Sequence, residues 1–166
     1  MPGSVCRVRL QGTSVTVVAG LDESVAGGRE PITEELALEL ASGSDQNPTW
    51  PRPVAIHAVV VTGQDATRTV RRVSRWASYT SRVAVVPSER LSDGARVEAM
   101  LRGIWLVATG RPPQIVIHGE AGPTPGSERG LRHRLLDELV FEALIGERVT
   151  SRKVKPAASA ATRSAR

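Results

Sequence analysis

Residues 54–61 read VAIHAVVV, and this short apolar run decides the fold class. The run is bounded by Pro53 and Gly63 and is rich in β-branched residues, so it predicts a strand that is buried on both faces of a sheet. Two similar runs follow at Val83–Val86 and Ile115–His118. The segments between them, 65–79 and 92–109, carry apolar residues at helical spacing. This alternation predicts parallel βαβ units with right-handed crossovers.

The segments on either side extend this sheet. Val5–Leu10 and Val15–Ala19 flank the turn sequence QGTS, which predicts an N-terminal β-hairpin. A short helix is expected from Pro31 to about Gly43. Ser127 caps a last helix, which Gly146 ends and whose apolar stripe is Leu131, Leu135, Leu139 and Ala143. The predicted fold is therefore α/β, a mostly parallel sheet of about five strands flanked by about four helices, with an N-terminal β-hairpin.

Charge is distributed unevenly along the 166 residues. The formal net charge is +5, but residues 148–166 hold six Lys or Arg residues and no acid. Without those six, 16 basic residues stand against 17 acidic ones, a net charge of −1. We therefore expect a near-neutral α/β domain over 1–147 and a disordered basic tail over 148–166, because the tail has too little apolar surface to fold alone.

Several classes of site and location are not expected. Cys6 is the only cysteine, so the chain has no internal disulfide and no multi-cysteine metal site. His57 lies within a predicted strand and is expected to be a hydrogen-bonded core residue, so no metal is predicted. No P-loop, dinucleotide-binding or nucleophile-elbow motif is present, and we expect no cofactor. No apolar stretch can span a bilayer and no signal peptide is seen, which predicts a cytoplasmic protein without membrane contact.

Candidate ligand-binding residues lie in the loops that follow the predicted parallel strands. Ligands of such sheets bind outside the carboxyl ends of the strands, where helix N-termini also point. We expect these loops to lie together at one edge of the sheet, although ordinary turn and cap chemistry explains the same residue types. The candidates are Gly63, Ser88, Gly119, Ser127 and Arg129.

His118 and Glu120 are the candidate catalytic pair. A histidine at the carboxyl end of a strand can act as general acid or base, and a nearby carboxylate can orient it. This pair supports one alternative function, a small enzyme or inactive enzyme relative that binds a phosphorylated or carboxylated metabolite.

Four arginines recur at helical spacing in the first predicted helix after the 54–61 run. Positions i, i+3, i+4 and i+7 share one helix face, with Tyr79 and Trp76 continuing beside it. Arginines on such a face contact the phosphates of nucleic acid or an acidic partner protein, unless they merely solvate the surface. The basic tail favours the binding role. The candidate contacts are Arg68, Arg71, Arg72, Arg75, Arg152, Lys153 and Lys155.

The predicted helix 92–109 is apolar on much of its circumference, including Trp105. One sheet face should not cover so much apolar surface, which predicts a dimer or another partner on this helix. A subunit of a homo- or hetero-oligomer is thus a further alternative. We expect a binding or regulatory protein rather than an enzyme.

Overall fold

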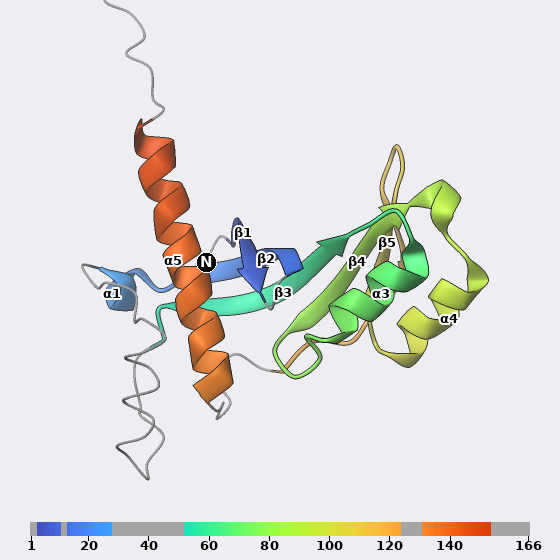
Figure 1. Ribbon diagram of the computed structural model, residues 1–166, viewed down its shortest axis with the longest axis horizontal. Coiled ribbons are helices and arrows are strands. Elements are labelled where there is room, and N and C mark those ends of the chain that lie inside the picture. The colour runs from blue at the N-terminus through green and yellow to red at the C-terminus, as the bar shows by residue number, and fades with distance from the viewer. Residues whose placement is uncertain (1–2, 11–12, 28–51, 124–130, 154–166) are drawn as a thin grey trace, which may run out of the picture.

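The computed structural model describes residues 3–10, 13–27, 52–123 and 131–153, and within them an α/β fold built on a six-stranded sheet (Figure 1). The strands lie side by side in chain order, from β1 to β6. The strands are β1 (Ser4–Leu10), β2 (Thr13–Leu21), β3 (Val54–Thr62), β4 (Ser81–Pro87), β5 (Trp105–Thr109) and β6 (Gln114–Ile117). The helices are α1 (Glu23–Ala26), α3 (Ala66–Ser74), α4 (Asp93–Leu101) and α5 (Leu131–Lys153), with a 3-10 turn η1 at Ser88–Arg90.

The sheet is mixed. β3, β4 and β5 are parallel, whereas the pairs β1–β2, β2–β3 and β5–β6 are antiparallel. The predicted N-terminal hairpin is confirmed, with Ser4 opposite Ala19 and Leu10 opposite Thr13. The expectation of a mostly parallel sheet of about five strands is wrong. The predicted helix at 31–43 lies outside the described residues.

The predicted helix 92–109 is two elements. Ser92 does cap α4, since its Oγ accepts from the N–H of Ala95 at 3.2 Å. The helix stops at Leu101 because Gly103 adopts a φ of 59°. The N–H of Gly103 then donates to Met100 and the N–H of Ile104 to Ala99, the pairing of a Schellman C-cap. The apolar residues beyond Gly103 form β5 instead of a second helix face.

The last strand runs opposite to its prediction. Only residues 110–113 connect β5 to β6, and a parallel crossover needs a dozen or more residues. β6 therefore pairs with β5 as an antiparallel hairpin, with Leu106 opposite Ile117. Its end lies at the amino edge of the parallel strands.

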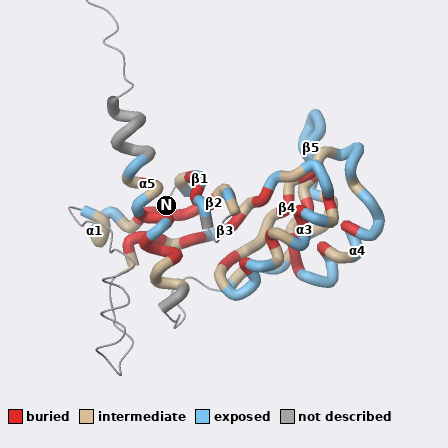
Figure 2. The backbone as a smooth tube through the Cα atoms, viewed as in Figure 1, coloured by how far each residue is buried: buried red, intermediate tan, exposed pale blue. Residues whose placement is uncertain are grey.

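All the long helices cover one face of the sheet. α3 and α5 lie in front of the strands in Figure 1, and the buried residues in Figure 2 follow the strands and the helix faces against them. Val17, Val59 and Leu106 are fully buried on this face. Side chains of the opposite face are half-buried or exposed, with Gly20 as the buried exception. The expectation that the 54–61 run is buried on both faces is wrong for the described part of the chain.

His57 is not a core residue. It is exposed, and the register between β2 and β3 shifts there, because Ala19 pairs with Ile56 while Val18 pairs with Ala58. This bulge adds one residue to β3. It keeps Ile56 and Val59 on the same buried face and leaves His57 outside the core.

α5 is attached to the start of β3. The guanidinium of Arg52 donates to Oδ2 of Asp137, with Nε at 2.7 Å and Nη2 on the same oxygen. The helix runs past Gly146, where the sequence predicts its end, to Lys153. The predicted boundary between domain and tail at 147 and 148 thus falls within α5, while residues 154–166 lie outside the described part. None of the described helices is long and apolar enough to cross a membrane.

Candidate nucleic-acid interface

α3 separates an apolar face from an arginine face. Asp65 begins the helix, since its Oδ1 accepts from the N–H of Arg68 at 2.8 Å. The buried residues of the helix are Ala66, Thr69, Val70 and Val73. The arginines fall between these positions and therefore project away from the sheet.

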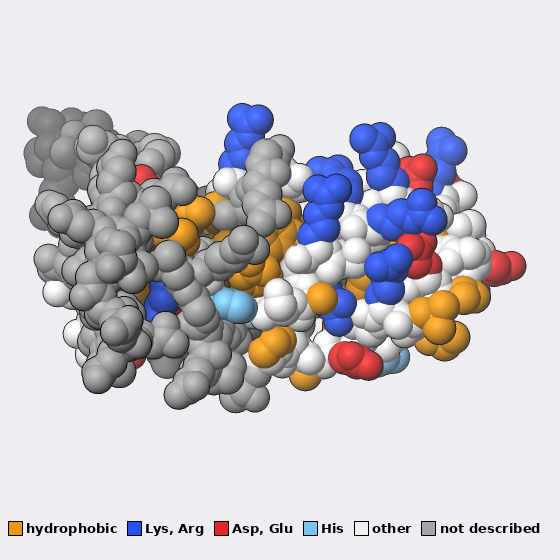
Figure 3. Space-filling view, turned by 60° about the horizontal axis from the view of Figure 1, so that its bottom comes forward, with side chains coloured by type: hydrophobic (Ala, Val, Ile, Leu, Met, Phe, Trp, Pro, Cys, Tyr) orange, Lys and Arg blue, Asp and Glu red, His pale blue; other side chains and the backbone are white. Residues whose placement is uncertain are grey.

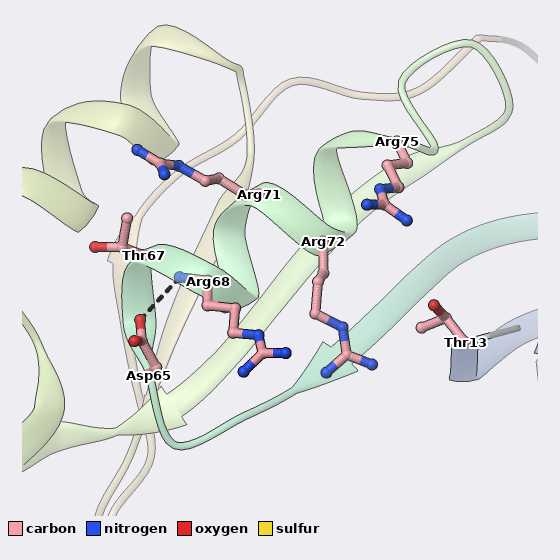
Figure 4. Close-up of a pocket in the computed structure, with 7 residues that line it drawn as sticks. All are labelled: Thr13, Asp65, Thr67, Arg68, Arg71, Arg72 and Arg75. Carbon is pink, nitrogen blue, oxygen red and sulfur yellow. Dashed lines mark hydrogen bonds between the residues drawn. The ribbon is translucent and has the colours of Figure 1, made fainter.

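Four arginines line an open groove beside α3, three of them on the side of the helix that faces the hairpin. Figure 4 shows Arg68, Arg72 and Arg75 on the side of the helix that faces Thr13, at the start of β2. The groove has a volume of about 560 Å³. Its lining residues are Thr13, Asp65, Thr67, Arg68, Arg71, Arg72 and Arg75. The hairpin and α3, far apart in the sequence, thus form one polar groove.

Arg71 lies apart from the other three. It points toward α4 in Figure 4, and its Nε donates to Oε1 of Glu98 at 3.1 Å. Arg102 pairs with the same carboxylate at 3.2 Å. Glu98 of α4 thus pairs with one of the four predicted arginines, and the other three remain as a row on the opposite side of α3.

The other three guanidinium groups form no ion pair with any described residue. Arg68 and Arg75 are exposed and Arg72 is half-buried. Asp65 is the one acid among the described lining residues, and it already accepts the backbone hydrogen bond that caps α3. Figure 3 shows Lys and Arg side chains gathered over this part of the surface. The groove consequently has an excess of positive charge.

Among the described residues, no aromatic side chain lines the groove. Trp76 is buried in the core, contrary to the expectation that it continues beside the arginine face. The ring of Tyr79 lies 5.9 Å from that of Trp76 and 4.4 Å from that of His133. These contacts occupy Tyr79, so the groove offers guanidinium and hydroxyl groups but no platform for stacking a base.

The candidate ligand loops are divided between the two edges of the sheet. Gly63 and Ser88 lie at the carboxyl edge, where the N–H of Gly63 donates to the carbonyl of Val85 at 3.1 Å. His118, Gly119 and Glu120 follow β6 and lie at the opposite edge. The expectation that all these loops meet is wrong because β6 is antiparallel. Ser127 and Arg129 lie outside the described residues.

The structure gives His118 and Glu120 separate contacts, and their catalytic role stays a prediction. His118 is exposed and its ring lies 5.1 Å from that of Trp105. Glu120 donates its N–H to Gly103 at 3.0 Å, and its carbonyl accepts from Trp105 Nε1 at 3.3 Å. No hydrogen bond joins His118 to Glu120 in the described part of the chain. Gly119 is required there for packing, because a Cβ would collide with the backbone of Trp105.

The described residues include no group of three or more His, Cys, Asp or Glu side chains that could hold a metal ion. Of the predicted tail contacts, Arg152 and Lys153 lie in the last turns of α5, while Lys155 is outside the described residues. Their part in binding stays a prediction.

Thr13 and Glu98 are the site residues that sequence reasoning missed. Thr13 reaches the groove only through the pairing of β2 with β3, and Glu98 reaches Arg71 only through the packing of α4 beside α3. Neither residue carries a motif.

No protein-family model, curated protein or solved structure matches this chain, so its function is argued from its own residues.

Proposed function

We propose that the protein binds nucleic acid through its phosphate backbone, at the groove lined by Arg68, Arg72 and Arg75. The observation that carries this proposal is the row of three guanidinium groups without an ion pair among the described residues. Unpaired guanidinium groups on a helix face attract an anionic ligand, whereas Arg71 and Arg102 share the carboxylate of Glu98 and attract it less strongly.

The spacing of the row fits a repeating anion. Arg68 and Arg75 are seven residues apart, a rise of about 10.5 Å along the helix axis. One strand of duplex DNA places a phosphate about every 3.4 Å along its axis, so the row spans roughly three phosphates. Guanidinium groups bind phosphate in a bidentate manner, and the hydroxyls of Thr13 and Thr67 offer further donors in the same groove.

The composition of the groove favours binding without sequence preference. Base readout needs side chains that enter a groove of the duplex, and single-strand readout needs aromatic rings for stacking. The described lining residues contain no aromatic ring, and the arginines, which can also read guanine, form a row along α3 that fits successive phosphates. The affinity should therefore come from counterion release and fall steeply with salt. The basic residues at 148–166 would add to this sequence-independent affinity.

Fluorescence anisotropy with random-sequence duplex DNA tests the proposal, using the full chain across a salt series. The test variant replaces Arg68, Arg72 and Arg75 by Gln, and the control is Arg96→Gln, an exposed arginine of α4 that is not among the lining residues of the groove. Each lost phosphate contact lowers the salt slope by about 0.9, so the triple variant should lose about 2.7 while the control stays near the wild type. Polyglutamate as competitor separates nucleic acid from an acidic protein partner.

Two results would refute the proposal. One is a wild-type chain that does not bind duplex DNA even at low salt. The other is an equal loss of affinity in the triple variant and in Arg96→Gln. Competition by polyglutamate as strong as that by DNA would instead assign the groove to an acidic protein.

A further inference from the structure

The face of the sheet that the helices leave uncovered is apolar. Cross-strand partners share a face, so the register defines two rows across the strands on this side. One row is Thr16, Val60, Val83 and Trp105, and the other is Thr62, Val85, Val107 and Ile115. We call these two rows the open face. None of their side chains is buried, and Ile115 is 52% exposed.

The centre of the open face carries no charge. The side chains of the two rows on β3, β4 and β5 are aliphatic or aromatic apart from small hydroxyls, as in strands that are covered on both sides. The imidazole of His57 lies outside these rows, against Gly20. Arg7 and Arg9 lie at the margin, on the edge strand β1, opposite Thr16 and Ser14. A contiguous apolar patch with a charged margin is typical of a protein interface.

We propose that a second copy of the chain covers the open face, with the two sheets packed against each other around a two-fold axis. Six strands about 4.8 Å apart, with a mean length of about 22 Å, give a flat area of roughly 600 Å². A standard interface buries about 800 Å² of accessible surface on each partner, and a corrugated sheet face of this size approaches that value.

Self-association also fits the chemistry of this surface. A two-fold dimer uses the same patch on both copies, so the patch must tolerate itself as its own partner. Uncharged valines meet this condition because no like charges are brought together, and aliphatic sheet faces pack at about 10 Å. α3 lies on the other face of the sheet, so the arginine groove stays accessible in the dimer. The inference is thus independent of the proposed function.

A competing surface exists on α4. Val97, Met100 and Leu101 are 50%, 61% and 78% exposed and follow one another at helical spacing. This stripe contains three side chains on a nine-residue helix and is smaller than the open face. It nevertheless provides the matched control for the experiment.

Sedimentation equilibrium of the full chain tests the inference with Val85→Glu against Leu101→Glu. We expect a dimer for the wild type and for Leu101→Glu. For Val85→Glu, a charge at the centre of the interface should weaken association about 30-fold or more. Circular dichroism and thermal unfolding check that each variant is folded. The paired variant Val83→Thr with Val85→Thr keeps the β-branched shape and should weaken the dimer in the same direction if Val85→Glu does not fold.

A wild-type chain that is monomeric at every concentration overturns the inference. So does a dimer that Leu101→Glu dissociates while folded Val85→Glu leaves it intact, because the contact would then lie on α4.

Discussion

Replacing Arg52 by Met should destabilise the fold more than replacing an arginine whose ion pair lies at the surface. The guanidinium of Arg52 pairs with Asp137, whose side chain is 2% exposed, and this pair joins the start of β3 to α5. The substitution leaves the carboxylate buried without this cation. Removing one partner of a buried ion pair costs about 3–5 kcal/mol. The arginine itself is 19% exposed, so we expect the lower end of that range.

The matched control is Arg71→Met. Its ion pair with Glu98 lies at the surface, where the arginine side chain is 67% exposed, and such pairs contribute about 0–1 kcal/mol. Urea unfolding followed by circular dichroism measures both variants on the full chain. A difference of less than about 1 kcal/mol between Arg52→Met and Arg71→Met would refute the view that a buried ion pair fixes α5.

Three further predictions concern the groove and the tight turns. Asp65→Asn keeps the helix cap and removes the one lining carboxylate, so duplex DNA should bind up to about fivefold more tightly in the anisotropy assay, and weaker binding would contradict the electrostatic account. Gly103→Ala should lose about 1–2 kcal/mol in urea unfolding because of its positive φ. Gly122→Ala should lower the free energy of unfolding by more, since its Cβ would collide with the backbone at Ser81. The control Gly94→Ala meets open space and should change stability by less than about 1 kcal/mol. Equal effects at Gly122 and Gly94 would show that the turn is not packed in this way.

The parts of the fold that were predictable from sequence depend on local signals. The hairpin at 4–21, the strand from Val54 and the capped starts of α3 and α4 follow from turn residues, β-branched runs and the hydroxyl or carboxylate at Ser92 and Asp65. Gly103 and the β-branched and aromatic run after it also mark the end of α4. The apolar spacing continues past Gly103, however, and this continuation predicts a longer helix than the structure has.

The wrong predictions concern features that depend on contacts between residues far apart in the sequence. The direction of β6 depends on a short connection, and with it the edge at which His118 lies. Leu139 is 46% exposed while Leu136, Val140 and Leu144 are buried, because α5 crosses the strands at an angle that its own sequence does not specify. The arginine row was predictable from spacing, whereas the loss of Arg71 to an ion pair with α4 was not.

The most direct test of the central claim is a nuclear magnetic resonance titration of the full chain with duplex DNA. We expect the amide signals of α3 and of Thr13 to shift together as DNA is added, and to return to their free positions as salt is raised. Shifts confined to the His118–Pro123 loop, at the opposite edge of the sheet, would contradict the account and move the ligand site away from the arginine groove.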